Sequence, residues 1–153
     1  MKMLVCTDGS IHSQQTVEEA LKIAEVCSFD EIAIIHVYPQ PQDLSYLGQE
    51  ATREHITRFR ELVREYKAQG EKILADALQV FEKKNIKART ILEKGHPADT
   101  IIRVATGERV DMIVIGSRGL GGFKKTLLGS VSSAVVEEVN DCIVFMVKEV
   151  KVK

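Results

Sequence analysis

Glycines and cations gather in one stretch of the chain, residues 116–132. The stretch holds five of the ten glycines of the protein, and its cations, with no acid among them, are Arg118, Lys124 and Lys125. Glycine is favoured where a backbone takes a positive φ or closely approaches another group, such as a phosphate. A helix is expected to begin at Ser130, and the unpaired amides at a helix N-terminus attract phosphate. The stretch therefore predicts a site for a phosphate-bearing ligand, to which the hydroxyls of Ser130 and Ser132 would donate hydrogen bonds.

A solvated loop in which Ser130 only caps the next helix is the structural alternative. Connections of more than about 12 to 15 residues without secondary structure are uncommon unless they have a function or are disordered, which favours ligand binding. The spacing is neither that of a P-loop, which needs Gly-Lys-Ser/Thr, nor that of the dinucleotide fingerprint, which should follow the first strand. The residues alone thus predict a phosphate-bearing ligand and do not identify it.

The elements that must position this stretch follow from the apolar pattern. Short apolar runs predict strands at residues 3–7, 32–37, 88–92, 112–115 and 143–147. Apolar residues at helical spacing lie between these runs, including a long helix over 52–83 that is either continuous or broken near Gly70. Strict alternation of this kind predicts an α/β fold, a doubly wound five-stranded parallel sheet with helices on both faces.

In the strand order 3-2-1-4-5, the chain reverses direction between strands one and four. Ligands of such sheets bind outside the carboxyl ends of the strands at this point. The segment Thr7-Asp8-Gly9-Ser10, after strand one, and the loop from Gly116, after strand four, would line the crevice.

Length and composition limit the class of protein. A chain of 153 residues suits a single domain over 1–153, and 44% hydrophobic with 28% charged residues is typical of a soluble globular protein. The net charge of −1 gives no footprint for nucleic acid or an anionic membrane. The first apolar run is too short for a signal-peptide core, so a cytoplasmic location is expected. The widely spaced cysteines, which match no metal or disulfide motif, are Cys6, Cys27 and Cys142.

The glycine spacing resembles a known signature. Gly116-x-x-Gly119, nine residues and then Gly129-Ser130 is similar to the ATP-binding motif of the universal stress protein family. The likeness covers nearly the whole chain, with Val-x-Thr-Asp-Gly-Ser near the N-terminus, His36-Val37, Gly95-x-Pro97 and Asp-Met-Ile-Val-Ile-Gly at 111–116. The resemblance implies the same five-stranded, adenine nucleotide alpha hydrolase-like fold.

The resemblance also implies a ligand, ATP, often with a divalent metal such as magnesium. Asp8 would contact the ribose or the metal-phosphate unit, and the backbone of Thr7 and Val37 would hold the adenine. The residues implied to hold ribose and phosphates are Gly116, Arg118, Gly119, Gly129, Ser130, Val131 and Ser132. Asp8 has an alternative role as a turn residue after the first strand. A single magnesium on Asp8 and the phosphates suits the ligand preferences of that ion.

A homodimer through the last strand is a further implication of the resemblance. The chain departs from the family there, because the family usually has Pro near the position of Ile143, after a Cys like Cys142. The departure does not touch the residues implied to bind the nucleotide.

Other polar residues have structural readings. His36 and His96 lie beside predicted turns and are expected to be structural, while His12 and His55 are expected to face solvent. The charges of the long helix alternate in sign, which is typical of a solvated face and not of a nucleic-acid stripe. Its apolar stripe, which includes Ile56, is expected to pack on the sheet of its own chain, with docking of a partner helix as the alternative.

A phosphate cradle without an evident catalytic set predicts an ATP-binding stress-response or signalling module that acts on an unknown protein partner. One alternative is a slow ATPase or autokinase in which Ser130, Ser132 or Thr126 receives phosphate, although no clear base is identified. Another is a nucleotide-independent dimeric interaction protein whose loop binds another anion or nothing. No catalytic residue is assigned.

Overall fold

Five strands and four helices alternate along the part of the chain that the structure, a computed structural model, describes: residues 1–40, 52–119 and 128–148. The strands are β1 (Lys2–Cys6), β2 (Glu31–Tyr38), β3 (Arg89–Lys94), β4 (Met112–Gly116) and β5 (Ile143–Val147). The helices are α1 (Ile11–Val26), α2 (Arg53–Glu82), α3 (Pro97–Glu108) and α4 (Ser130–Glu138). Each predicted strand is present, with bounds that differ by at most two residues from those observed.

The strands form one parallel sheet in the order β3-β2-β1-β4-β5, which confirms the predicted doubly wound topology. β1 lies at the centre, where Val5 is in register with Ile34 of β2 and Val114 of β4. These three side chains are fully buried. Unbroken apolar runs of this kind are typical of parallel strands that are covered on both faces.

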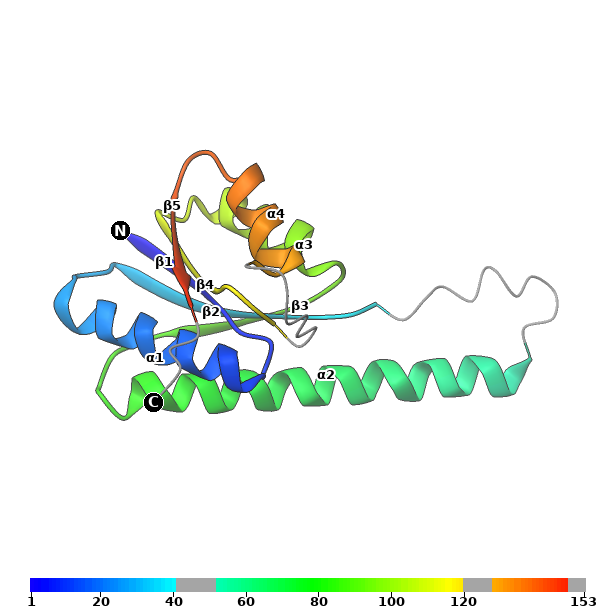
Figure 1. Ribbon diagram of the computed structural model, residues 1–153. Coiled ribbons are helices and arrows are strands. Elements are labelled where there is room, and N and C mark those ends of the chain that lie inside the picture. The colour runs from blue at the N-terminus through cyan, green and yellow to red at the C-terminus, as the bar shows by residue number, and fades with distance from the viewer. Residues whose placement is uncertain (41–51, 120–127, 149–153) are drawn as a thin grey trace, which may run out of the picture.

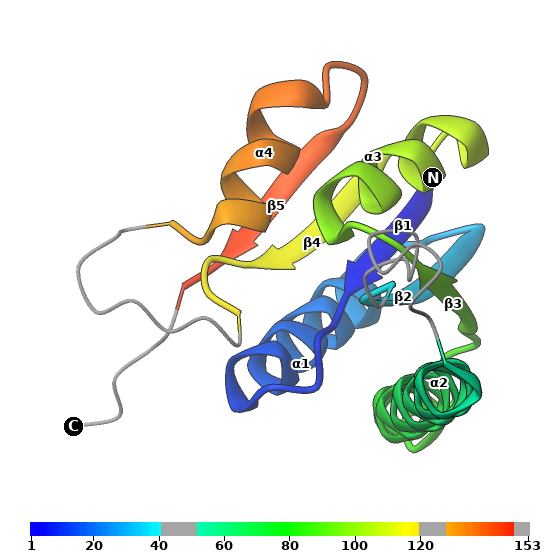
Figure 2. The ribbon, with the colours of Figure 1, turned by 90° about the vertical axis from the view of Figure 1, so that its right-hand side faces the viewer.

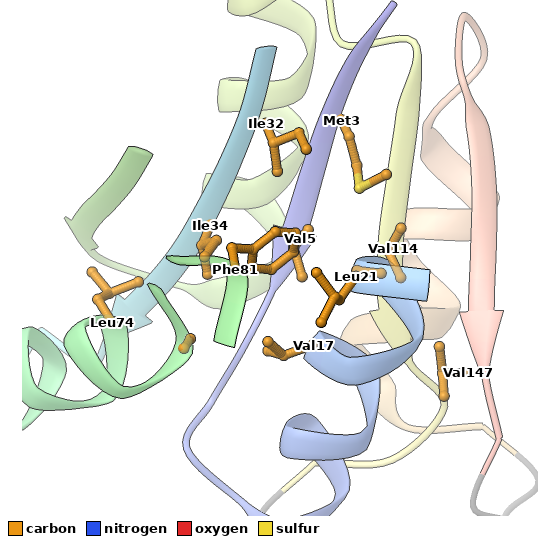
Figure 3. Packing of buried hydrophobic residues seen from close by; sticks show 12 residues of the cluster. Met3, Val5, Val17, Leu21, Ile32, Ile34, Leu74, Phe81, Val114 and Val147 are labelled. Atoms are coloured by element: carbon orange, nitrogen blue, oxygen red, sulfur yellow. The ribbon is translucent and has the colours of Figure 1, made fainter. Parts of the chain in front are cut away.

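Helices cover both faces of the sheet (Figures 1 and 2). α1 and α2 lie on one face, where Leu21 and Phe81 pack against β-strand residues such as Ile34 (Figure 3). α3 and α4 lie on the other face, where Ile101 and Val135 belong to a second buried cluster. Two cores on opposite faces hold the sheet fixed, and with it the described residues that directly follow β1, β3 and β4.

α2 is a single helix that continues through Gly70. Gly70 allows a close approach to the sheet, because a Cβ there would lie 2.7 Å from Leu92 Cδ1 and 2.9 Å from His36 Cδ2. The buried residues of α2 all lie from this point onward: Gly70, Leu74, Ala77 and Phe81.

The prediction that the whole apolar stripe of α2 packs on its own sheet is wrong for the amino-terminal half, where Ile56 is 39% exposed. The reason is length. A helix of 30 residues spans about 45 Å, whereas a strand of eight residues spans about 26 Å. Among the helices of the described residues, none combines the length and the apolar character needed to cross a lipid bilayer.

Candidate functional site

The chain leaves β1 through a turn that is fixed by hydrogen bonds. The Thr7 N–H donates to Ile35 O at 3.0 Å, and the Thr7 hydroxyl donates to Ser13 Oγ at 3.1 Å. The Thr7 carbonyl accepts a hydrogen bond from His36 Nδ1 at 2.9 Å, which confirms the structural role predicted for His36. Gly9 then takes a φ of +79°, a conformation that favours glycine. Thr7 is therefore held in place from three directions.

Asp8 uses its two carboxylate oxygens differently. Oδ1 accepts a hydrogen bond from the Ser10 N–H at 2.9 Å, so Asp8 does stabilise the turn after β1. Oδ2 faces the loop after β4, because a Cβ on Gly119 would lie 2.7 Å from this oxygen. The absence of a side chain on Gly119 thus leaves room beside Asp8 Oδ2.

Ser117 ties the loop after β4 to its surroundings. Its N–H donates to Val147 O of β5 at 2.8 Å. Its carbonyl accepts hydrogen bonds from the Gly129 N–H at 2.6 Å and from the Ser132 hydroxyl at 3.3 Å. These contacts bring the start of α4 beside the end of β4, although about ten residues separate Gly119 from Gly129 along the chain.

The N-cap of α4 is Gly129, and no side chain caps the helix, so the expectation of Ser130 as N-cap is wrong. Ser130 is the first helical residue and is exposed. The first intrahelical bond runs from the Ser133 N–H to Gly129 O at 3.0 Å. The N–H groups of the three residues before it, Ser130, Val131 and Ser132, have no hydrogen-bond acceptor in the described part of the chain. They are available to an anion at the helix N-terminus.

The hydroxyl of Ser132 has a different role from the one predicted. Ser132 is buried, and its hydroxyl lies 3.0 Å from Gly129 O and 3.3 Å from Ser117 O as a donor to both carbonyls. A hydroxyl has a single proton to donate. The Ser132 hydroxyl therefore stabilises the loop, and the residue can offer a ligand its backbone N–H.

A cleft of about 840 Å³ lies at this end of the sheet. The structure brings all ten predicted binding residues to its lining: Thr7, Asp8, Val37, Gly116, Arg118, Gly119, Gly129, Ser130, Val131 and Ser132. Three residues that the sequence associated with the same stretch, Lys124, Lys125 and Thr126, lie outside the described residues.

Two walls of the cleft were missed by the sequence analysis. Ile101 of α3 and Ile115 of β4 give it an apolar side, and Tyr66 and Ile73 of α2 line it as well. The close packing of α2 at Gly70 brings that helix to the cleft. A glycine on the apolar stripe of a helix was the available signal, but it did not indicate which strand the helix approaches.

The cleft combines ionisable, polar and apolar groups. Its lining includes one carboxylate, that of Asp8, and one thiol, that of Cys6, whose pKa is raised to about 12 by burial. Within residues 1–40, 52–119 and 128–148, no cluster of three or more His, Cys, Asp or Glu side chains could hold a metal ion. The arrangement suits a ligand with an anionic end, hydroxyl groups and a flat apolar part.

The other histidines lie away from this chemistry. His55 is exposed and takes part in the capping box of α2 with Thr52. His12 is half-buried, so the expectation that it faces solvent is only partly met. His96 is exposed, with Nδ1 3.6 Å from Asp99 Oδ2.

Comparisons with known proteins found relatives that match almost the whole chain. The sequence model described as "Universal stress protein family" matches residues 1–148. Universal stress protein YxiE of Bacillus subtilis is 36% identical over 149 residues, which are 96% of this chain and 98% of that protein.

Two solved structures show the same fold. Universal stress protein UspA from Lactobacillus plantarum aligns with a TM-score of 0.81 and 23% identity over 96% of this chain and 97% of the other. An Arabidopsis thaliana protein of the same family, solved with AMP bound, aligns with a TM-score of 0.68 and 21% identity over 99% of this chain and 93% of that chain.

Proposed function

The chain belongs to the universal stress protein family, and from this premise we propose that it is an ATP-binding stress-response or signalling module. One observation carries the proposal. Asp8 Oδ2, the Gly116–Gly119 turn and the N-terminus of α4 converge on one cleft from segments far apart in the sequence. A family member with AMP bound has the same fold, which supports an adenine nucleotide as the ligand.

In the proposed complex, each part of the nucleotide has a partner. The N–H groups of Ser130, Val131 and Ser132 bind phosphate oxygens together with the Gly119 backbone and Arg118. Asp8 Oδ2 accepts hydrogen bonds from ribose hydroxyls. The adenine lies against the apolar side of the cleft, beside the backbone of Thr7 and Val37 and the side chains of Ile101 and Ile115.

We favour ATP over AMP because the spacing Gly116-x2-Gly119-x9-Gly129-Ser130 resembles the ATP-binding motif of the family. Magnesium fits this site only with the nucleotide, because Asp8 is the one carboxylate that the described residues bring to the lining and Mg²⁺ usually combines one or two carboxylates with substrate phosphates and water. Bound there, the ion would neutralise phosphate charge. The protein without nucleotide is expected to bind magnesium weakly.

We also propose that residues 1–153 form one nucleotide-binding domain, that the protein acts in the cytoplasm, and that it forms a homodimer. Three cysteines without disulfides support the cytoplasm. β5 is an edge strand on which Ile143 and Phe145 are 58% and 41% exposed, which supports an interface there. Transfer of phosphate to Ser132 is disfavoured by the buried position of its hydroxyl.

Calorimetry with ATP, ADP and AMP, each with and without magnesium, tests the proposal. We expect ATP to bind, and the Asp8→Ala variant to bind it at least about tenfold more weakly, a loss of about 1.4 kcal/mol. The matched control is Asp76→Ala, which removes an exposed carboxylate of α2 and should leave the affinity unchanged. Because the chain has no tryptophan and three tyrosines, co-purified nucleotide would be evident from absorbance at 260 nm.

The result that would contradict the proposal is the absence of binding by all three nucleotides at millimolar concentration. Release of inorganic phosphate from ATP that depends on Asp8 would instead favour the slow ATPase.

A further inference from the structure

The amino-terminal half of α2, residues 53–69, carries apolar side chains that are exposed or only half-buried. Four of them follow helical spacing and form what we call the α2 strip: Ile56, Phe59, Val63 and Tyr66. Ile56 is exposed and the other three are half-buried. Figure 1 shows this half of α2 extending past the ends of α1, α3 and α4. The strip continues the line of the buried residues of α2, but no part of the sheet covers it.

Cations lie along one side of the α2 strip. They recur at spacings of seven, four and three residues, which places them in one line on the helix, here called the cationic row: Arg53, Arg60, Arg64 and Lys67. Arg60 and Lys67 each follow a residue of the strip by four positions. The acids of this half, Glu54, Glu61 and Glu65, lie on the side of the helix opposite the strip.

Acids of the described residues do not pair with the cationic row. In the described part of the chain, none of its four residues forms an ion pair. The carboxyl-terminal half of the same helix differs, because Lys72 Nζ lies 3.1 Å from Asp76 Oδ2. Lys67 also borders a groove of about 570 Å³ beside the edge strand β3, lined by residues that include Leu74 and Leu92. The row thus leads into a concave surface next to the sheet edge.

We propose that the α2 strip and the cationic row bind one acidic amphipathic helix of a partner protein. Apolar side chains of the partner would cover the strip, and its carboxylates would pair with the row, as in helix-in-groove recognition and in the flanking charges of coiled coils. Seventeen residues of α2 offer a contact about 25 Å long. This inference is argued without the nucleotide, although Tyr66 at the end of the strip also lines the cleft.

A second copy of the same face fits less well. In an antiparallel pair of α2 helices, the cationic row of one copy would face the row of the other. In a parallel pair it would face the opposite flank of the strip, which holds His55, Leu62 and Gln69 and no acid. Neither arrangement gives a cation a carboxylate.

A lipid surface also fits less well. A flat bilayer would contact both flanks of the strip alike, whereas only one flank carries the row. Half-buried side chains such as Phe59 and Val63 are reached more readily by the side chains of a single helix. The charge asymmetry therefore favours a protein helix.

Fluorescence anisotropy on the full chain tests the proposal. The probe is a labelled synthetic peptide of about 20 residues with leucine and isoleucine at heptad positions a and d and glutamate beside them. We expect saturable binding that weakens as salt is raised, and weaker binding of a scrambled peptide of the same composition. The Arg60→Glu/Lys67→Glu variant should bind the peptide at least about tenfold more weakly.

The control is Arg58→Glu/Lys72→Glu, which changes the net charge equally on the other side of α2 and should bind like the unchanged protein. Circular dichroism checks that both variants are folded. Three results would overturn the proposal: no binding of the peptide, an equal loss in both variants, or binding of phosphatidylserine vesicles in place of the peptide. A doubling of mass in ultracentrifugation that Phe59→Ser abolishes would overturn it too, because a second copy would then occupy the strip.

Discussion

The two ends of the sheet use polar groups in opposite ways. At the amino ends of the strands, charged side chains have partners within the protein: Arg89 contacts Glu31 and Glu108, and Asp111 Oδ2 accepts a hydrogen bond from the backbone N–H of Lys2 at 2.6 Å. At the carboxyl ends, the N–H groups at the start of α4 have no acceptor within the described residues and border a cleft. The fold therefore keeps the charged groups that stabilise it at one end of the sheet, and the polar groups that are available to a ligand at the other end. Substitutions at the two ends should therefore act on different properties.

The largest expected effect is on the free energy of unfolding at alkaline pH, and it comes from Cys6, at the carboxyl end of β1. Burial raises the pKa of its thiol to about 12, whereas an unfolded cysteine has a pKa of about 8.5 to 9. The thiol's contribution to stability is present in full below the unfolded pKa and is lost as the pH rises toward the folded pKa. Between pH 8 and pH 10.5, the protein should lose about 2 kcal/mol more unfolding free energy than Cys6→Ala does.

Denaturant unfolding of both proteins at the two pH values measures this difference. The alanine variant has a constant cavity cost, so the comparison rests on the change with pH. Equal losses in the two proteins would mean that the thiol under the cleft ionises as easily in the folded state as in the unfolded one.

The next largest expected effect is on ATP affinity, with stability unchanged, and it comes from a substitution of Gly119. An alanine Cβ at Gly119 would lie 2.7 Å from Asp8 Oδ2 and displace that carboxylate. Gly119→Ala should weaken ATP binding by about tenfold or more with little change in the unfolding midpoint. Gly107→Ala is the matched control, because a Cβ on this α3 glycine meets no atom within 4 Å, and alanine in a helix stabilises it by about 0.5 to 1 kcal/mol relative to glycine. Calorimetry measures the ATP affinity of both variants, and thermal unfolding measures their midpoints. Unchanged affinity in Gly119→Ala would refute the placement of Asp8 beside the ligand.

The smallest expected effect is on thermal stability, with ATP affinity unchanged, and it comes from a substitution of Arg89. Its guanidinium lowers the pKa of the Glu31 carboxyl through a hydrogen bond. A lowered pKa contributes stability that is present above the unfolded pKa of Glu and is lost as the pH falls through the folded value. Arg89→Ala should lower the thermal midpoint by a few degrees at most at neutral pH, because exposed ion pairs contribute little.

The control for Arg89 is Arg103→Ala, which breaks one ion pair with Glu93. The deficit of the Arg89 variant should shrink as the pH falls through the lowered folded pKa of Glu31, and its ATP affinity should equal that of the unchanged protein. A change in affinity would show that the two ends of the sheet are not independent.

Much of this architecture could be predicted from the sequence, because its signals are local. Unbroken apolar runs identified the strands, and their alternation with helices identified a parallel sheet covered on both faces. The strand order was assumed from the doubly wound class, and the structure has it. The glycines at 116, 119 and 129 marked close approaches that the structure contains. The apolar runs, their alternation with helices and the glycines all concern the conformation of the backbone, which depends strongly on residue type.

The features that the sequence could not predict depend on distant contacts. The hydroxyl of Ser132 is engaged by Ser117 O, fifteen residues away, and Ser130 begins α4 without capping it because Gly129 holds the cap position. The apolar stripe of α2 has one period from Ile56 to Phe81, but the sheet ends before the helix does. Periodicity identifies a face of a helix and not what covers it.

The central claim is that an adenine nucleotide occupies the cleft at the carboxyl end of the sheet. Amide NMR of the isotope-labelled protein during titration with magnesium ATP tests it most directly. We expect saturable shifts of the Gly119, Ser130, Val131 and Ser132 amide signals, with those of Glu31, Arg89 and Asp111 unmoved. Saturable shifts confined to the amino end, or no shifts at millimolar ATP, would contradict the claim.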